Sequence, residues 1–69
     1  MATVDLTEAT FEAALADNTI MFIDFWAGWC GPCMAFGPVY ERVSEDHPDV
    51  LFAKVDTEAE QALAGAFGI

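Results

Sequence analysis

Residues 20–26 form a nearly continuous run of bulky apolar side chains, and this run constrains the fold more than any other feature of the chain. A run of this length that is rich in β-forming residues is typical of a strand buried on both faces. Asp24 is the only charged residue in it. We therefore expect residues 20–26 to form the central strand of a sheet.

Strands and helices alternate on both sides of this run. The pattern predicts a strand at 3–6, a helix over 7–18, a helix over 30–46, a strand at 50–56 and a last helix through about residue 67. Thr57 and Glu60 match a capping box for that last helix. The order β-α-β-α-β-α predicts an α/β fold with parallel strands, and the length, 69 residues, leaves room for one domain over residues 1–69.

Two prolines fall in the predicted helix 30–46. Pro32 lies in its first turn, where the amide that proline lacks would have no partner in any case. Pro38 lies well inside the helix and removes a hydrogen bond there, so we expect a kink near residues 37–38.

The chain's only two cysteines, Cys30 and Cys33, flank Gly31-Pro32 at the start of this helix. Two thiols at this spacing can open and close a disulfide without rearranging the fold. The helix start favours the thiolate of Cys30, whereas Cys33 lies one turn deeper and is expected to be more buried. The pattern therefore predicts that Cys30 attacks a substrate disulfide and that Cys33 resolves the mixed disulfide.

Asp24 is the candidate general base for Cys33, because burial in an apolar strand favours the neutral carboxyl group and brings its titration toward the useful range. The alternative is that Asp24 merely faces a polar edge of the strand. Lys54, in the neighbouring predicted strand, is its candidate partner.

The net charge of the chain limits the kinds of partner that it can bind. The formal net charge is −10, with twelve carboxylates against Arg42 and Lys54, which argues against binding to nucleic acid or to an anionic membrane. Residues 1–5 carry no basic segment and no apolar run is long enough to span a bilayer, so we expect a cytoplasmic protein. In that reducing compartment a Cys-x-x-Cys pair is more often reactive or metal-binding than structural.

Other interpretations are less favoured. A zinc site needs about four ligands, and His47 is the only plausible third after the two thiols. Trp26 is most simply a core aromatic, whereas Trp29, in a loop beside Gly28, is expected to be exposed and functional. The carboxylates of the predicted helix 30–46 are most simply a solvated face: Glu41, Glu45 and Asp46. The other large apolar residues are most simply packing residues: Met21, Met34, Phe22, Phe36 and Phe52.

Residues 24–33, Asp-Phe-Trp-Ala-Gly-Trp-Cys-Gly-Pro-Cys, resemble the active-site signature of the thioredoxin family. Pro38 falls where that family kinks its second helix, and Lys54 resembles a family lysine that lies near the buried acid. The resemblance covers essentially the whole chain. It implies a thioredoxin-like fold, with Cys30 as nucleophile, Cys33 as resolving thiol and Asp24 as proton carrier.

The resemblance also implies a flat docking face for disulfide-containing proteins, made by Trp29 with Gly28, Gly31 and Pro32. The expected function is reduction of protein disulfides, with no bound cofactor other than the redox-active disulfide, and with recharging by an NADPH-linked thioredoxin reductase. Gly-Pro between the thiols favours reduction in that family.

Two departures from the family matter. Met34 stands where relatives commonly have a basic residue, which removes a positive charge near the thiols. The chain also ends before the region where the family places its cis-proline loop, two further strands and a last helix. We expect residues 20–26 to have an exposed apolar edge, and the chain to be weakly stable, to self-associate through that edge, or to need a complementing partner. A truncated binding or assembly module without efficient turnover is thus the alternative function.

Overall fold

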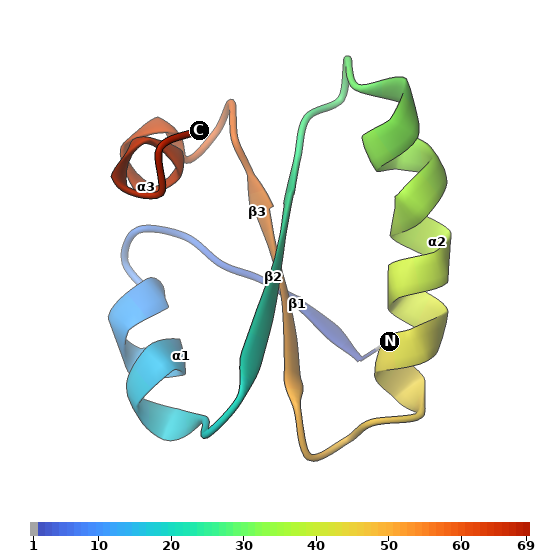
Figure 1. Ribbon diagram of the computed structural model, residues 1–69. Helices are drawn as coiled ribbons and strands as arrows, with labels where there is room; N and C mark the ends of the chain where they lie inside the picture. The colour runs from blue at the N-terminus through green and yellow to red at the C-terminus, as the bar shows by residue number, and fades with distance from the viewer. Residues whose placement is uncertain (1) are drawn as a thin grey trace.

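The computed structural model describes residues 2–69 and has the predicted order of strands and helices (Figure 1). The elements are β1 (Thr3–Asp5), α1 (Phe11–Asp17), β2 (Met21–Trp26), α2 (Gly31–Glu45), β3 (Leu51–Asp56) and α3 (Gln61–Ala66).

The three strands form one parallel sheet in the order β1-β3-β2. The prediction that residues 20–26 are the central strand is therefore wrong, because β3 lies in the middle and β2 at an edge. Burial agrees: Val55 of β3 is 0% exposed, whereas Phe22 of β2 is 52% exposed. An apolar run shows that a strand can be buried, but it does not show which strand has two neighbours. The exposed edge expected for β2 is confirmed, since no strand within residues 2–69 pairs with its other side.

Helices cover both faces of the sheet, with α2 on one side and α1 and α3 on the other (Figure 1). Alternate residues of a strand point to opposite faces. The face under α1 and α3 holds the apolar core, made by Leu6, Ala53, Val55 and Leu63, with Phe11, Ala14, Met21, Ile23 and Phe25 packed against it.

The helix starts differ from those predicted because side chains find partners elsewhere. Helix α1 begins at Phe11, since Thr7 and Thr10 close a turn in which the Thr7 amide donates to the Thr10 hydroxyl at 3.0 Å. The capping box predicted for α3 is wrong. The Thr57 hydroxyl donates to the Trp26 carbonyl at 3.0 Å, and the Glu60 carboxylate accepts from the Glu8 amide at 2.9 Å. Tertiary contacts thus replace the local cap.

Helix α2 is fastened to the sheet by Tyr40, which is buried. Its hydroxyl donates to the carbonyl of Phe22 in β2 at 3.1 Å and to that of Ala53 in β3 at 2.8 Å. The helix continues through Pro38 without interruption. Val39, the next residue before Tyr40, is 43% exposed, so the buried face of α2 is narrow.

Candidate active site

Cys30 and Cys33 are joined by a disulfide, with their Cα atoms 5.2 Å apart. Cys30 is the N-cap of α2, and its Sγ accepts a hydrogen bond from the Cys33 amide at 3.3 Å. The first amides of a helix have no partner within the helix, and they stabilise negative charge near its start. The local fold therefore holds the Cys30 sulfur where a thiolate is favoured.

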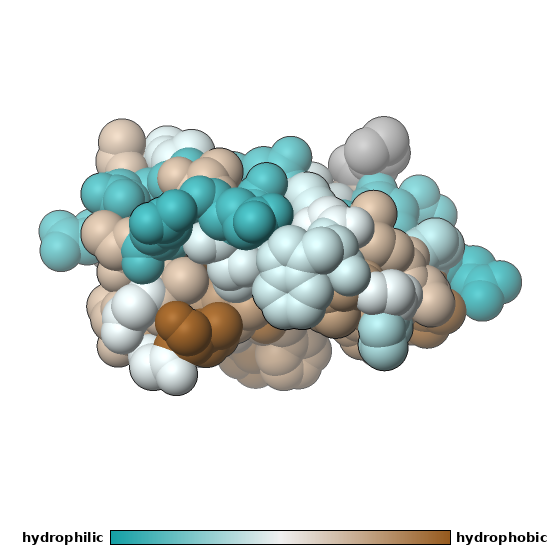
Figure 2. Space-filling model, turned by 90° about the horizontal axis from the view of Figure 1, so that it is seen from above, coloured by the Kyte–Doolittle hydropathy of each residue, from teal (hydrophilic) through white to brown (hydrophobic). Residues whose placement is uncertain are grey.

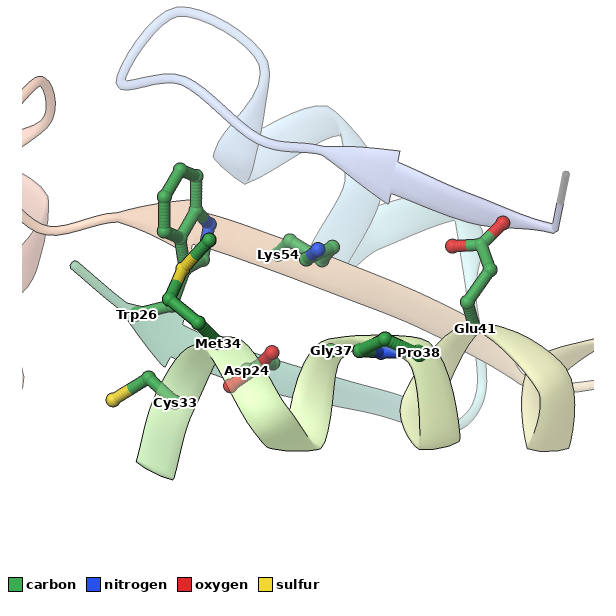
Figure 3. Close-up of a pocket in the computed structure, with 8 residues that line it drawn as sticks. All are labelled: Asp24, Trp26, Cys33, Met34, Gly37, Pro38, Glu41 and Lys54. Atoms are coloured by element: carbon green, nitrogen blue, oxygen red, sulfur yellow. The ribbon is translucent and has the colours of Figure 1, made fainter. Parts of the chain in front are cut away.

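Both cysteines are half-buried, and the greater burial expected for Cys33 stays a prediction. In Figure 3 the Cys33 sulfur points away from the Asp24 carboxylate. A proton passing between these two groups therefore needs an intermediary, such as water.

The loop before α2 presents an exposed surface next to the disulfide. Trp29 is 76% exposed, and Gly28, Gly31 and Pro32 are also exposed. A Cβ atom added at Gly28 or Gly31 would meet nothing within 4 Å. Packing therefore does not require glycine at either position, and the small residues leave open space around the tryptophan.

A cavity of about 340 Å³ lies beside the disulfide, between α2 and the strands β2 and β3 (Figure 3). Its lining brings together most of the residues that the sequence singled out in this region: Asp24, Trp26, Cys33, Met34, Gly37, Pro38, Glu41 and Lys54. Trp26 is thus a wall of this cavity and not simply a core aromatic.

Three buried polar atoms of the lining have no hydrogen-bond partner within residues 2–69: Asp24 Oδ2, Trp26 Nε1 and Glu41 Oε1. Buried polar atoms are almost always paired with protein groups or water. A cavity of this volume has room for several waters, each of which occupies about 30 Å³. The site is therefore suited to hold water between its polar groups.

Asp24 lies inside this cavity and not at a polar edge of the strand. Burial raises the pKa of the Asp24 carboxyl above its ordinary value of 3.8, and the charge of Lys54 acts in the opposite direction. Lys54 also lies over the ring of Trp26, with its Nζ 5.6 Å from the ring centroid. Burial, and then the charge of Asp24, raise the pKa of the neighbouring Tyr40 phenol to about 12.

Glu41 is the polar residue of this cavity that the sequence interpretation missed. Assigning it to a solvated helix face is wrong, because it is half-buried and lines the cavity. One signal in the sequence pointed to it: Cys33, Gly37 and Glu41 are spaced by four residues, which places them on one face of a helix.

The structure brings no group of three histidine, cysteine or carboxylate side chains together to hold a metal ion within residues 2–69. His47 follows the C-terminal end of α2 and stacks on Phe52, with ring centroids 6.2 Å apart. The cysteines lie at the other end of this 15-residue helix, which is roughly 22 Å long. A site shared by His47 and the two thiols is therefore not formed.

Figure 2 shows the end of the molecule from which the loop between β2 and α2 emerges. Hydrophilic side chains gather on one side of this face, and apolar ones lie along the opposite margin.

No helix within residues 2–69 combines the length and the apolar character needed to cross a membrane.

The chain is similar to known proteins in both sequence and structure. The sequence model of the thioredoxin family matches residues 2–69. The putative thioredoxin 2 of Streptomyces coelicolor is 57% identical over 68 residues, which are 99% of this chain and 51% of that protein. The thioredoxin of Alicyclobacillus acidocaldarius is 41% identical, over 99% of this chain and 66% of that protein.

A solved structure of Plasmodium falciparum thioredoxin is similar to this chain with a TM-score of 0.91 and 31% identity, covering 97% of this chain and 67% of that one. The chain spans about half the length of the Streptomyces relative. The matched family model, the sequence identities and the shared fold agree, and the chain belongs to the thioredoxin family.

Proposed function

We propose that this chain is a thiol–disulfide oxidoreductase that reduces disulfides of other proteins. The observation that carries this proposal is the Cys30–Cys33 disulfide at the start of α2, with the Cys33 amide donating to Cys30 Sγ. A dithiol at this position can pass two electrons to a substrate without any bound cofactor, because the electrons are held by the sulfurs themselves.

The first step is attack by the Cys30 thiolate on one sulfur of a substrate disulfide. The Cys30–substrate bond forms as the substrate S–S bond breaks, and the second substrate sulfur leaves as a thiolate that takes up a proton. The helix start assists this step because it favours the anionic form of Cys30 before the attack.

The second step is attack by Cys33 on Cys30 Sγ. Cys33 first gives its proton to Asp24, through water in the cavity that both residues line. The Cys30–Cys33 bond then forms, the mixed disulfide breaks, and the other substrate sulfur leaves as a thiolate. The protein has lost two electrons and the substrate has gained them.

The remaining predicted residues support these steps. Trp29, Gly28, Gly31 and Pro32 form the exposed surface on which a substrate docks beside the disulfide. Trp26, Lys54 and Pro38 line the cavity that holds Asp24.

The oxidised chain needs a reductant, and we propose an NADPH-linked thioredoxin reductase as the partner that supplies it. The net charge of −10 disfavours nucleic acid and anionic membranes as partners. A cytoplasmic location, where protein disulfides are kept reduced, stays a prediction of this proposal.

Reduction of insulin by dithiothreitol tests the proposal. The wild-type chain is expected to accelerate the reaction, and Cys30→Ser is expected to abolish the acceleration. Cys33→Ser is the matched variant: reduced and then freed of dithiothreitol, it should still attack insulin but stop at a mixed disulfide that adds the mass of the substrate. Equal acceleration by wild type and Cys30→Ser would contradict the proposal.

A second function, an assembly module, is favoured by the edge of β2 that no strand among residues 2–69 covers. The carbonyls of Ile20 and Trp26 accept bonds from Leu51 and Thr57, so alternate residues of the strand face β3. The backbone groups of Met21, Ile23 and Phe25 then face away from the sheet, because the period of a strand is two. Ile20 and Phe22 beside this edge are 51% and 52% exposed.

Such an edge pairs readily with another strand, including that of a second copy. We expect sedimentation to reveal self-association that Phe22→Lys reduces. Leu15→Lys is the matched control, because Leu15 is 55% exposed but lies on α1, away from the edge. An association that is equally sensitive to both variants would contradict pairing through β2. Association that persists in Cys30→Ser separates this function from the redox reaction.

A further inference from the structure

Glu41 is a half-buried residue to which the exchange reaction assigns no role. Its Oε2 accepts a hydrogen bond from the hydroxyl of Thr3 in β1, which fixes the side chain from one side. Its Oε1 is buried and has no partner within residues 2–69. A carboxylate oxygen in that position lowers its free energy by facing a cation or ordered water.

Lys54 supplies the cation. Its Nζ lies 3.9 Å from the position that a Cβ atom would take at Gly37. Gly37 is four residues from both Cys33 and Glu41, hence about one helical turn from each. In Figure 3 the Lys54 ammonium lies between the carboxylates of Asp24 and Glu41 along the length of α2.

We propose that Glu41 is a positioning residue that shares the Lys54 ammonium with Asp24, through water in the cavity that all three line. Thr3 holds Glu41 in place, and Glu41 in turn keeps Lys54 from closing fully onto Asp24. Asp24 then feels only part of the attraction of Lys54 and retains its proton more readily. This inference deepens the proposed exchange reaction and rests on it for its consequence, since a protonatable Asp24 is what Cys33 needs.

The charged and titratable groups around the cavity come from every element packed against it. They are Asp24 on β2, Cys33, Tyr40 and Glu41 on α2, Lys54 and Asp56 on β3, and the exposed Asp5, which is in register with Lys54, on β1. Of these, the amine of Lys54 is the one cationic group, so it is the group for which the carboxylates compete.

Titration of the Asp24 carboxyl by NMR in the oxidised chain tests the proposal without any substrate. Glu41→Gln removes the competing charge, so Lys54 interacts more strongly with Asp24 and the pKa of Asp24 falls, with an increase of about threefold in its acid dissociation constant. Glu45→Gln is the matched control: it makes the same charge change on an exposed residue of α2 and should leave Asp24 unchanged.

The Lys54→Met background separates positioning from direct repulsion. If Glu41 acts through Lys54, Glu41→Gln has no further effect on Asp24 in that background. The same shift with and without Lys54, or no shift in Glu41→Gln alone, would overturn the proposal.

Thr3→Val provides a second variant in case Glu41→Gln does not fold. It removes the anchor of Glu41, so the Asp24 titration should move in the same direction by a smaller amount; an unchanged titration would contradict the role of the anchor. Because the titration is read without turnover, failure of insulin reduction and failure of this proposal are distinct results.

Discussion

The two faces of the sheet are built from alternate residues of the same strands, and they differ in kind. Under α1 and α3, Met21, Ile23 and Phe25 of β2 pack against a dry core around Ala53 and Val55. Under α2, the residues in between include Asp24 and Lys54, which line a cavity with three polar atoms that have no partner among residues 2–69. One face is therefore an apolar core, whereas the other combines buried aromatic side chains, Tyr40 and Phe52, with charged groups near the disulfide.

The difference between the faces shows how one short strand, β2, can contribute both to the apolar core and to the cavity. A period of two lets β2 place apolar side chains on one side and a buried carboxylate on the other, without a break in the strand. The predictions below test whether the faces really divide stability and chemistry in this way.

Val55→Ala tests the core face and has the largest expected effect on stability. Val55 is 0% exposed, so loss of two methyl groups and the resulting cavity should lower the free energy of unfolding by about 2 kcal/mol, measured by urea denaturation. Val39→Ala is the matched control on the other side of the sheet. Val39 is 43% exposed, and its variant should stay within about 0.5 kcal/mol of wild type. Equal effects would show that the burial of Val55 does not set its contribution to stability.

Asp24→Asn tests the cavity face and should act in the opposite direction. Asp24 Oδ2 is buried and has no hydrogen-bond partner in the described part of the chain, so removing its charge is expected to raise the free energy of unfolding at pH 7 by about 1 kcal/mol. The same change is expected to slow disulfide exchange about tenfold or more. Asp49→Asn, an exposed carboxylate, controls for the change in net charge. A loss of stability in Asp24→Asn would contradict the assignment of this face to chemistry.

The difference in the free energy of unfolding between wild type and Asp24→Asn depends on pH, because the pKa of Asp24 is raised. The folded state holds the Asp24 proton to higher pH than the unfolded state, whose pKa is near 3.8. The contribution of this group to stability is therefore lost as pH rises from about 3.8 through the raised pKa. Wild type and Asp24→Asn should be closest in stability at the acid end, and their difference should grow across that window. A constant difference would contradict the raised pKa.

Tyr40→Phe tests how α2 is attached to the sheet, and its expected effect on stability is no larger than that of Asp24→Asn. It removes the hydroxyl that donates to the carbonyls of Phe22 and Ala53, which should lower the free energy of unfolding by about 1 kcal/mol. Because this contact lies across the sheet from the core, its effect should add to that of Val55→Ala in the double variant. A coupling energy as large as either single effect would show that the faces do not act independently.

The fold was predictable from the sequence as far as local patterns determine it. The order of strands and helices follows from periodicity, and the N-cap position of Cys30 follows from the Cys-Gly-Pro-Cys motif at the end of a strand and the start of a helix. The order of strands in the sheet does not follow in this way. The apolar run of β2 indicated burial, but only the pairing of β1 with β3 reveals that β3 is central.

The cavity was predictable in part. Asp24, Lys54 and Cys33 were identified because a buried acid, a single lysine and a paired thiol are rare in such a chain. Glu41 was missed because one more carboxylate on an acidic helix resembles a solvated residue. Its carboxylate accepts a hydrogen bond from the hydroxyl of Thr3, 38 residues away in the chain, and no local pattern indicates that contact.

The central claim is that the start of α2 makes Cys30 the reactive thiol. Iodoacetamide alkylation of the reduced chain at pH 7, with each cysteine followed by mass spectrometry, tests it most directly. We expect Cys30 to react about tenfold faster in the folded chain than in the same chain unfolded in urea, and faster than Cys33 in the folded chain. Equal rates for Cys30 in the folded and unfolded chain would contradict the account.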